Sequence, residues 1–151
     1  MTYSVRQATE EDRDRIVLFN QAMARETEGY ELDRRILTTG VEKILGDPKR
    51  GLYFVAEHDG EVVGQIMTTT EWSDWRNGFV WWIQSVYVSK RHRRAGVYRQ
   101  LHDHVRELAR RKRAVGLRLY VDRDNESARS TYESLGMRPS QYVLFEDMWV
   151  G

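Results

Sequence analysis

The sequence contains no cysteine, which excludes disulfide bonds, thiolate metal ligands and a cysteine nucleophile. No apolar run approaches the ~20 residues of a membrane-spanning helix, and residues 1–15 lack the apolar core of a signal peptide. We therefore expect a cytoplasmic protein with no membrane partner. Proline occurs only at Pro48 and Pro139, and neither a linker nor an internal repeat is present, so we expect a single domain spanning residues 1–151.

The chain also lacks an excess of charge of one sign. Its 24 basic and 23 acidic residues leave a net charge of +1, which gives no global attraction to nucleic acid or to an anionic membrane. Lysine is scarce, so most of the basic residues are arginine. Arginine favours bidentate contacts with carboxylate and phosphate groups, and any phosphate-binding function must therefore depend on a local cluster.

Hydrophobic periodicity and turn signals predict a mixed chain of strands and helices. Strands are expected at residues 3–8, 52–57, 62–70, 79–88, 117–121 and 142–150, and helices after the N-cap Thr9 and at residues 33–45, 95–111 and 125–135. Asp59-Gly60 and Asn77-Gly78 are hairpin signals. The order predicts an α+β fold, with a mixed, mostly antiparallel sheet flanked by helices and a right-handed crossover after Val88.

The stretch KRHRRAGVYRQL, from Lys90 to Leu101, combines dense positive charge with one glycine before a predicted helix. The first amides of a helix have no intrahelical acceptor and lie at the positive end of the helix dipole. Gly96 would let a phosphate approach the backbone. A solvated cationic loop and a nucleic-acid patch are alternatives for the same residues.

The segment VSKRHRRAGVYRQL, from Val88 to Leu101, resembles the acetyl-CoA signature of the GNAT superfamily of N-acetyltransferases. Arg93 and Gly96 match that signature, and Tyr98 replaces its final small residue. The resemblance implies that backbone amides of this turn bind the coenzyme pyrophosphate; here these belong to Arg94, Ala95, Gly96, Val97, Tyr98 and Arg99.

Two further segments extend the resemblance. DNESARSTYESLG, from Asp124, is similar to a family segment that implies coenzyme contact by Asn125 and protonation of the leaving thiolate by Tyr132. The strand WWIQSVYV implies a bulge and a separation from the next strand. Pantetheine would bind the backbone around Val86, Tyr87 and Val88, and the Val86 amide would face the thioester oxygen. A purely structural role is the alternative in both cases. Tyr132 would then be a half-buried aromatic residue of its helix, and the strand would be part of the hydrophobic core.

The resemblance implies direct acetyl transfer to a primary amine, but the base is not evident. Many family members carry a glutamate on this strand, whereas residues 79–88 contain no carboxylate and Gln84 is the nearest polar residue. Glu71 is the preferred base because it is expected nearest the mouth of the cleft. The other candidates, each of which is equally compatible with a solvated surface position, are Asp74, Glu26 and Glu28.

Aromatic and acidic residues suggest how an acceptor would be bound. Trp72 and Trp75 bracket a turn, and their ring faces could bind a cation. Together with Gln84 and the carboxylates of Glu26, Glu28 and Asp74, they would suit a small cationic amine, although a peptide amine is equally allowed. Packing alone would also explain these tryptophans.

Other functions stay open at this stage. A basic face on residues 95–113 would suit binding to nucleic acid. The low net charge and the strands on both sides of this helix argue against it, so we predict no nucleic-acid partner. A non-catalytic acetyl-CoA-binding regulatory module would explain the missing strand glutamate. We predict no metal, because His102 and His104 lie two residues apart on a helix and face different directions. The resemblance also implies a possible homodimer.

Overall fold

The computed structural model describes residues 2–151. They divide into two compact units, the first ending at Leu119 and the second spanning Tyr120–Gly151. The first unit contains β1 (Ser4–Gln7), the 3-10 turn η1 (Glu10–Asp12), α1 (Arg13–Glu28), α2 (Arg34–Gly46), β2 (Leu52–His58), β3 (Glu61–Ser73), β4 (Gly78–Val88), the 3-10 turn η2 (Lys90–His92), α3 (Val97–Arg111) and β5 (Gly116–Arg118). The second unit contains α4 (Glu126–Ser134).

The five strands form one mixed sheet in the order β1-β2-β3-β4-β5. The first four strands pair antiparallel with their neighbours, and β5 pairs parallel with β4 after the α3 crossover. The two hairpins turn where Asp-Gly and Asn-Gly predict them, with positive φ angles at Asp59, Gly60 and Asn77. These turns confirm the predicted antiparallel part of the sheet.

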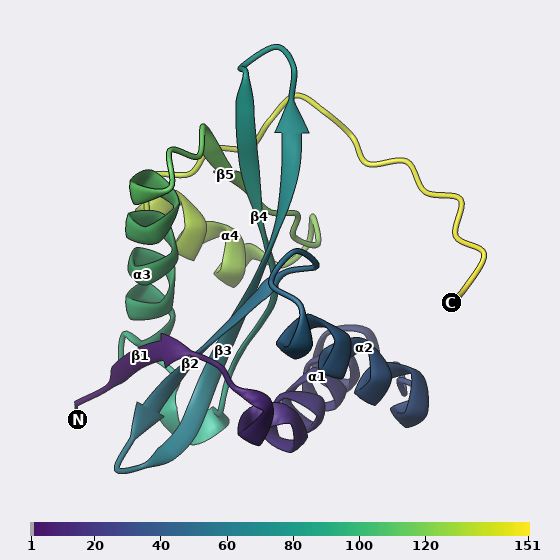
Figure 1. The fold of residues 1–151 in the computed structure, drawn as a ribbon, viewed down its shortest axis with the longest axis vertical. Coiled ribbons are helices and arrows are strands. Elements are labelled where there is room, and N and C mark those ends of the chain that lie inside the picture. The colour runs from purple at the N-terminus through teal and green to yellow at the C-terminus, as the bar shows by residue number, and fades with distance from the viewer. Residues whose placement is uncertain (1) are drawn as a thin grey trace. The chain divides into compact units, whose positions relative to one another are not determined.

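Helices cover both faces of the sheet. In Figure 1, α1 and α2 lie on one face and α3 on the other. Tyr53 and Phe54 are neighbours on β2 but belong to different buried clusters, because successive strand residues point to opposite faces. Tyr53 packs with Ile16 of α1, whereas Phe54 packs in the cluster that contains Leu101 of α3. The sheet therefore holds α1 and the start of α3 in fixed positions on opposite sides of β4.

Local capping signals set the helix starts as the sequence predicts. The Thr9 amide donates to Asp12 Oδ2 at 2.8 Å, which completes a capping box with Asp at its third position. Asp33 Oδ1 accepts hydrogen bonds from the amides of residues 35 and 36, and Asn125 Oδ1 accepts one from the Ala128 amide. No helix within residues 2–151 has the length and apolar character that a membrane crossing needs.

Two strand predictions differ from the structure. The predicted strand at residues 142–150 is wrong, because this segment pairs with no other strand among the described residues. The predicted strand at residues 117–121 is realised only as β5, which ends at Arg118. An extended sequence pattern becomes a strand only where a neighbour accepts its backbone hydrogen bonds, and the single chain supplies none at these positions.

Candidate active site

Strand β4 carries a bulge close to its C-terminal end. Gln65 on β3 lies opposite Tyr87, whereas Met67 lies opposite Gln84, so β4 has one extra residue between these pairs. Ser85 occupies the bulge with a φ of 50°, in the left-handed region. A bulge of this kind re-aims the strand and interrupts its ladder.

Gln65 fills the space behind the bulge. Its side chain is fully buried, and Nε2 donates to the Ser85 carbonyl oxygen at 2.9 Å. Its other polar atom, Oε1, is buried without a hydrogen-bond partner among the described residues. Sequence reasoning missed Gln65, although a single polar residue within the otherwise apolar stretch 62–67 was the available signal.

Strands β4 and β5 separate just before the bulge. Their parallel pairing is limited to Val80, Trp81 and Trp82 opposite β5. Beyond Trp82, β4 continues to Val88 while β5 has ended, which leaves backbone groups of β4 without a β5 neighbour. The structure thus has the bulge that the sequence resemblance implies, and the β4–β5 ladder ends at Trp82.

The turn after β4 leads into α3 through two left-handed residues. Arg94 has a φ of 62° and Gly96 a φ of 82°, and alternating backbone conformations of this sort turn successive N–H groups toward one concave surface. Within residues 2–151, no backbone carbonyl accepts from the amides of Arg94, Ala95, Gly96, Val97 or Arg99. A Cβ added to Gly96 would meet no atom within 4 Å, so the approach to this backbone is clear.

Close packing fixes this helix terminus against the sheet. A Cβ on Gly64 of β3 would lie 3.1 Å from Val97 Cγ1 and 3.2 Å from the Tyr87 carbonyl oxygen, so glycine allows the close approach of α3. The unpaired amides, the helix dipole and the basic side chains together fit a diphosphate. The residues present therefore suit the nucleotide end of acetyl-CoA.

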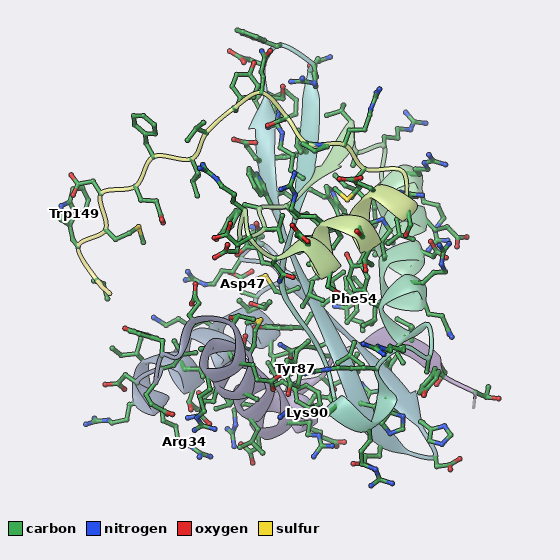
Figure 2. The ribbon with its side chains drawn as sticks, turned by 180° about the vertical axis from the view of Figure 1, so that it is seen from behind. Arg34, Asp47, Phe54, Tyr87, Lys90 and Trp149 are labelled. Atoms are coloured by element: carbon green, nitrogen blue, oxygen red, sulfur yellow. The ribbon has the colours of Figure 1, made fainter. Side chains whose placement is uncertain are left out.

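A second cluster joins α1 to the end of β4. Tyr87 Oη donates to Glu26 Oε2 at 2.5 Å, and Arg93 Nη2 donates to Glu26 Oε1 at 2.7 Å. Arg93 Nε also donates to the Val88 carbonyl oxygen at 2.9 Å, and its guanidinium lies 5.2 Å from the centre of the Tyr87 ring. Figure 2 labels Tyr87 beside the helices that cover this face. The Arg93 side chain therefore joins the coenzyme turn to α1 while the neighbouring amides remain available.

The cluster fixes the protonation states of its members. Burial acts to raise the pKa of Glu26, but hydrogen bonds from Tyr87 and Arg93 outweigh it and hold this pKa below its usual value. Burial, together with the Glu26 hydrogen bond and charge, raises the pKa of the Tyr87 phenol. Glu26 is consequently a charged carboxylate at neutral pH with both oxygens engaged, which argues against it as the base.

Glu71 lies beside the point where β4 and β5 separate. Its Oε1 accepts hydrogen bonds from Arg118 Nη1 at 2.7 Å and from Trp82 Nε1 at 3.2 Å. Oε2 makes no hydrogen bond among the described residues and is the oxygen left to accept a proton. Nearer the bulge, Gln84 Nε2 donates to Thr69 Oγ1 at 2.6 Å.

Comparison with known proteins agrees with this geometry. The model of the acetyltransferase (GNAT) family matches residues 9–137. The chain belongs to the GNAT acetyltransferase family. As a member of this family, the chain is an acetyltransferase, an enzyme that uses acetyl-CoA as the donor of the acetyl group. No curated protein matches the sequence.

Solved structures show the same GNAT fold. A "possible acetyltransferase" from Clostridium difficile 630 is 43% identical, with 100% of each chain covered and a TM-score of 0.91. A "predicted acetyltransferase with acetyl-CoA" from Clostridium acetobutylicum is 16% identical over 97% of this chain and 96% of its own, with a TM-score of 0.81. An aminoglycoside acetyltransferase from an uncultured soil metagenomic sample is 20% identical over 100% of each chain, with a TM-score of 0.74.

The remaining candidate acceptor residues of this acetyltransferase are not gathered near Glu26. Trp72 and Trp75 lie at the far end of the β3–β4 hairpin, where Trp72 packs edge-on against Phe79. Tyr87, which contacts Glu26, is about 26 Å farther along β4 at the usual rise per strand residue. A small acceptor therefore cannot contact both groups.

The other two acidic candidates lie in different parts of the molecule. Asp74 is at the same hairpin tip and accepts from the Trp75 amide. Glu28 ends α1 as an exposed residue and makes no ion pair in the described part of the chain. Only Glu26 and Gln84, among the candidate acceptor residues, lie in the region of β4 that flanks the bulge.

The second unit carries Asn125 and Tyr132 on the same helix. Asn125 is the N-cap of α4 and uses its Oδ1 for capping, so its amide nitrogen is the group that could reach a ligand. Tyr132 is partly buried, and burial raises the pKa of its phenol. The hydroxyl is therefore protonated at neutral pH, as a proton donor requires.

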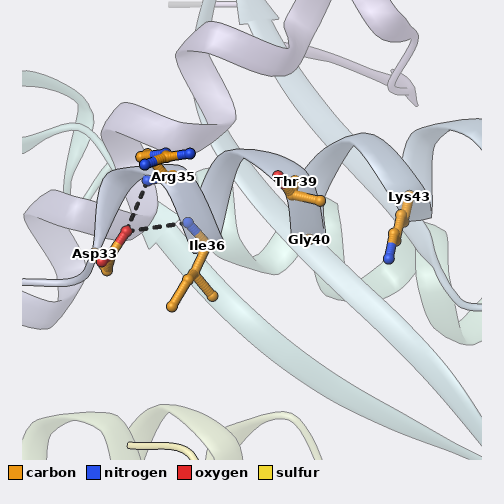
Figure 3. A pocket seen from close by; sticks show the side chains of 6 residues that line it. All are labelled: Asp33, Arg35, Ile36, Thr39, Gly40 and Lys43. Atoms are coloured by element: carbon orange, nitrogen blue, oxygen red, sulfur yellow. Dashed lines mark hydrogen bonds between the residues drawn. The ribbon is translucent and has the colours of Figure 1, made fainter.

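An additional hollow lies along one side of α2 (Figure 3). It has a volume of about 570 Å³ and is lined by Asp33, Arg35, Ile36, Thr39, Gly40 and Lys43. Its charged lining residues are of both signs, and Asp33 is occupied with the helix cap. No sequence motif predicts this hollow, because its lining residues come from one helix at helical spacing and include no unusual pattern.

Proposed function

We propose that this enzyme is an N-acetyltransferase that moves the acetyl group of acetyl-CoA directly to a primary amine, and that residues 1–151 act as one catalytic domain. The observation that carries the proposal is the bulged β4, separated from β5 and leading into the turn at Gly96. A family match that spans both units, residues 9–137, supports a single catalytic domain. A cytoplasmic location stays a prediction from the sequence.

We assign coenzyme binding to the β4 end and to the start of α3. Amides of residues 94–99 would hold the pyrophosphate, with Arg93 keeping the turn against α1 through Glu26. Backbone groups of Val86, Tyr87 and Val88 would hold pantetheine. The Val88 carbonyl already accepts from Arg93, so its contact with pantetheine would require a shared or displaced hydrogen bond. Asn125 would contribute from α4.

In the proposed reaction, the amine nitrogen attacks the thioester carbonyl carbon, and the carbon–sulfur bond breaks. The Val86 amide would stabilise the negative charge that develops on the oxygen. Tyr132 would give its phenolic proton to the departing thiolate, which its raised pKa allows at neutral pH. The attacking nitrogen then loses its extra proton to solvent, and the Tyr132 phenolate takes up a proton from solvent. The products are an acetylated amine and the free thiol of the coenzyme.

The amine must first lose a proton. An alkylammonium with a pKa near 10.4 costs about 4–5 kcal/mol to deprotonate at neutral pH. Glu71 would accept this proton at Oε2 through a chain of water molecules, because its partner Val80 lies about 20 Å along β4 from Val86. Arg118 and Trp82 hold its other oxygen. Gln84 would orient the acceptor beside the bulge.

The acceptor is proposed to be a small amine, with cationic amines as the first choice. Charged Glu26 at the β4 end supports this choice, and so does the fold shared with an aminoglycoside acetyltransferase. Trp72, Asp74 and Trp75 would contribute only to a long acceptor, such as a peptide, because they lie far from Tyr87, the partner of Glu26. Glu28 follows Glu26 by two residues on α1 and would contact an acceptor from that end of the helix.

An acceptor screen tests the function. The purified chain would be incubated with acetyl-CoA and with polyamines, aminoglycosides, peptide amines or uncharged amines, and free thiol would be measured. Amine-dependent thiol release supports the enzyme. Coenzyme binding without release in any arm would favour the regulatory module, which the absence of a carboxylate from β4 makes the second candidate. Release with uncharged amines alone would overturn the cationic acceptor.

A pair of matched variants tests the base. Glu71→Gln should lower kcat by about 10²-fold, because glutamine cannot accept the proton of the amine. Glu61→Gln is the control, since Glu61 begins the same strand and is ion-paired with Arg15. If both variants keep the parental rate and pH profile, Glu71 is not the base.

A further inference from the structure

Tyr98 departs from the coenzyme signature at a position next to the proposed diphosphate site. The signature has a small residue there, whereas Tyr98 is the second residue of α3. Long side chains of a helix lean toward its N-terminus and cover the preceding turn. For Tyr98 that turn contains Arg94 and Ala95, whose amides we assign to the diphosphate. A tyrosine ring left free at this position would therefore compete with the coenzyme for space.

The structure holds the Tyr98 ring in another place. Tyr98 Oη lies 3.0 Å from Nδ1 of His102, which is one helical turn farther into α3. The two rings meet edge-on with their centres 5.6 Å apart, and Tyr98 packs against the buried cluster that contains Leu101. A Cβ added to Gly96 would meet no atom of the described residues within 4 Å, so this ring position leaves the turn open.

His102 is the buried residue that anchors the Tyr98 hydroxyl. Its side chain is fully buried, and its Nε2 lies 3.2 Å from Nη2 of Arg106, a further turn along the helix. Arginine has only donors, so Nε2 accepts this hydrogen bond. Burial, followed by the charge of Arg106, lowers the pKa of His102 to about 4. The imidazole is therefore neutral at pH 7, carries its one proton on Nδ1 and donates it to Tyr98 Oη.

The proposed reaction uses neither His102 nor Arg106. We propose that both are positioning residues, which hold the Tyr98 ring away from the diphosphate site through the hydrogen-bonded row Arg106–His102–Tyr98 and so make a bulky residue compatible with coenzyme binding. The three residues are spaced by four positions on α3, so they share one face of the helix. This role depends on the proposed coenzyme site but not on the identity of the acceptor.

Calorimetry with acetyl-CoA tests the row. His102→Leu removes both hydrogen bonds of the imidazole and releases Tyr98, so it should weaken acetyl-CoA binding by about tenfold. Adding Tyr98→Ala to His102→Leu removes the released ring and should recover most of that loss. S-acetylpantetheine lacks the diphosphate, so the ratio of its dissociation constant to that of acetyl-CoA should fall in His102→Leu and rise again in the double variant.

The matched control is His104→Leu, because His104 lies on the same helix but packs against Phe54. It should bind acetyl-CoA as the wild type does. Unchanged acetyl-CoA affinity in His102→Leu would overturn the role. A loss that Tyr98→Ala does not recover would also overturn it, because His102 would then act on the helix as a whole, or the Tyr98 hydroxyl would itself bind the coenzyme.

A second pair of variants decides the role if His102→Leu does not fold. Tyr98→Phe keeps the ring but removes its hydrogen bond, so it should bind acetyl-CoA about fivefold more weakly than Tyr98→Ala does. Equal affinities of these two variants would overturn the role. A wild-type chain that binds no acetyl-CoA would instead refute the proposed coenzyme site, and the positioning role with it.

Discussion

The change Gln65→Leu separates a functional role of the β4 bulge from a structural one. Gln65 donates to the Ser85 carbonyl at 2.9 Å, but its own Oε1 is buried without a partner. Losing the hydrogen bond costs about 1–3 kcal/mol, and removing the unpaired oxygen returns a similar amount. Leucine also has nearly the same volume, so the free energy of unfolding should change by less than about 1 kcal/mol.

The effect on activity should be much larger. Ser85 is held at a φ of 50°, a conformation that costs a non-glycine residue roughly 1–3 kcal/mol. Without the Gln65 bond, β4 is free to relax and shift the backbone of Val86 and Val88. A misplacement near 1 Å can cost about 10²-fold in rate, so kcat/KM should fall by about 10–100-fold.

Urea unfolding and thiol-release kinetics would measure the two effects on the same preparations. Thr68→Val is the control, because Thr68 is buried on the same strand but lies opposite Ile83, before the bulge. It should leave kcat/KM unchanged. The reasoning is refuted if Gln65→Leu keeps full activity, or if it lowers the free energy of unfolding by several kcal/mol.

Three further changes test other parts of the structure. Gly96→Ala forces alanine to a φ of 82° at a cost of about 1–2 kcal/mol and should weaken acetyl-CoA binding by roughly tenfold in calorimetry. Tyr132→Phe removes the proton donor and should lower kcat by about 10²-fold while the calorimetric affinity for acetyl-CoA is unchanged. The hydrogen bond from Arg6 is the main cause of a lowered Asp12 pKa, so its stabilisation is present at neutral pH and is lost as the pH falls through the folded-state pKa. Asp12→Asn should therefore cost about 2 kcal/mol in urea unfolding at pH 7, and this cost should shrink as the pH falls below the unfolded-state pKa of aspartate toward the folded-state value.

Local signals made most of the fold predictable. The Asp-Gly and Asn-Gly turns and the capping residues Thr9, Asp33 and Asn125 act within a few residues of their own position, so the sequence records them directly. Burial of one side of α3 follows in the same way from its periodic apolar residues. The segment 142–150 shows the limit, because periodicity describes the conformation that a segment favours and not the presence of a neighbouring strand.

Long-range side-chain contacts were not predictable. Glu26 is separated from Tyr87 and Arg93 by more than sixty positions in the chain, and no local pattern records that three such residues will meet. The motif identified Arg93 as a coenzyme residue, whereas its side chain binds α1 and the Val88 carbonyl. Likewise, the distance between Trp75 and Glu26 follows from strand length and register, which the sequence alone left open.

The central claim, that unpaired amides around Gly96 hold the diphosphate of the coenzyme, is tested most directly by calorimetry on the wild-type chain with two ligands. Acetyl-CoA should bind at one molecule per chain, and S-acetylpantetheine, which lacks the nucleotide diphosphate, should bind at least about 100-fold more weakly because it loses charge-assisted hydrogen bonds. Equal affinity for the two ligands, or no uptake of acetyl-CoA at millimolar concentration, would contradict the claim.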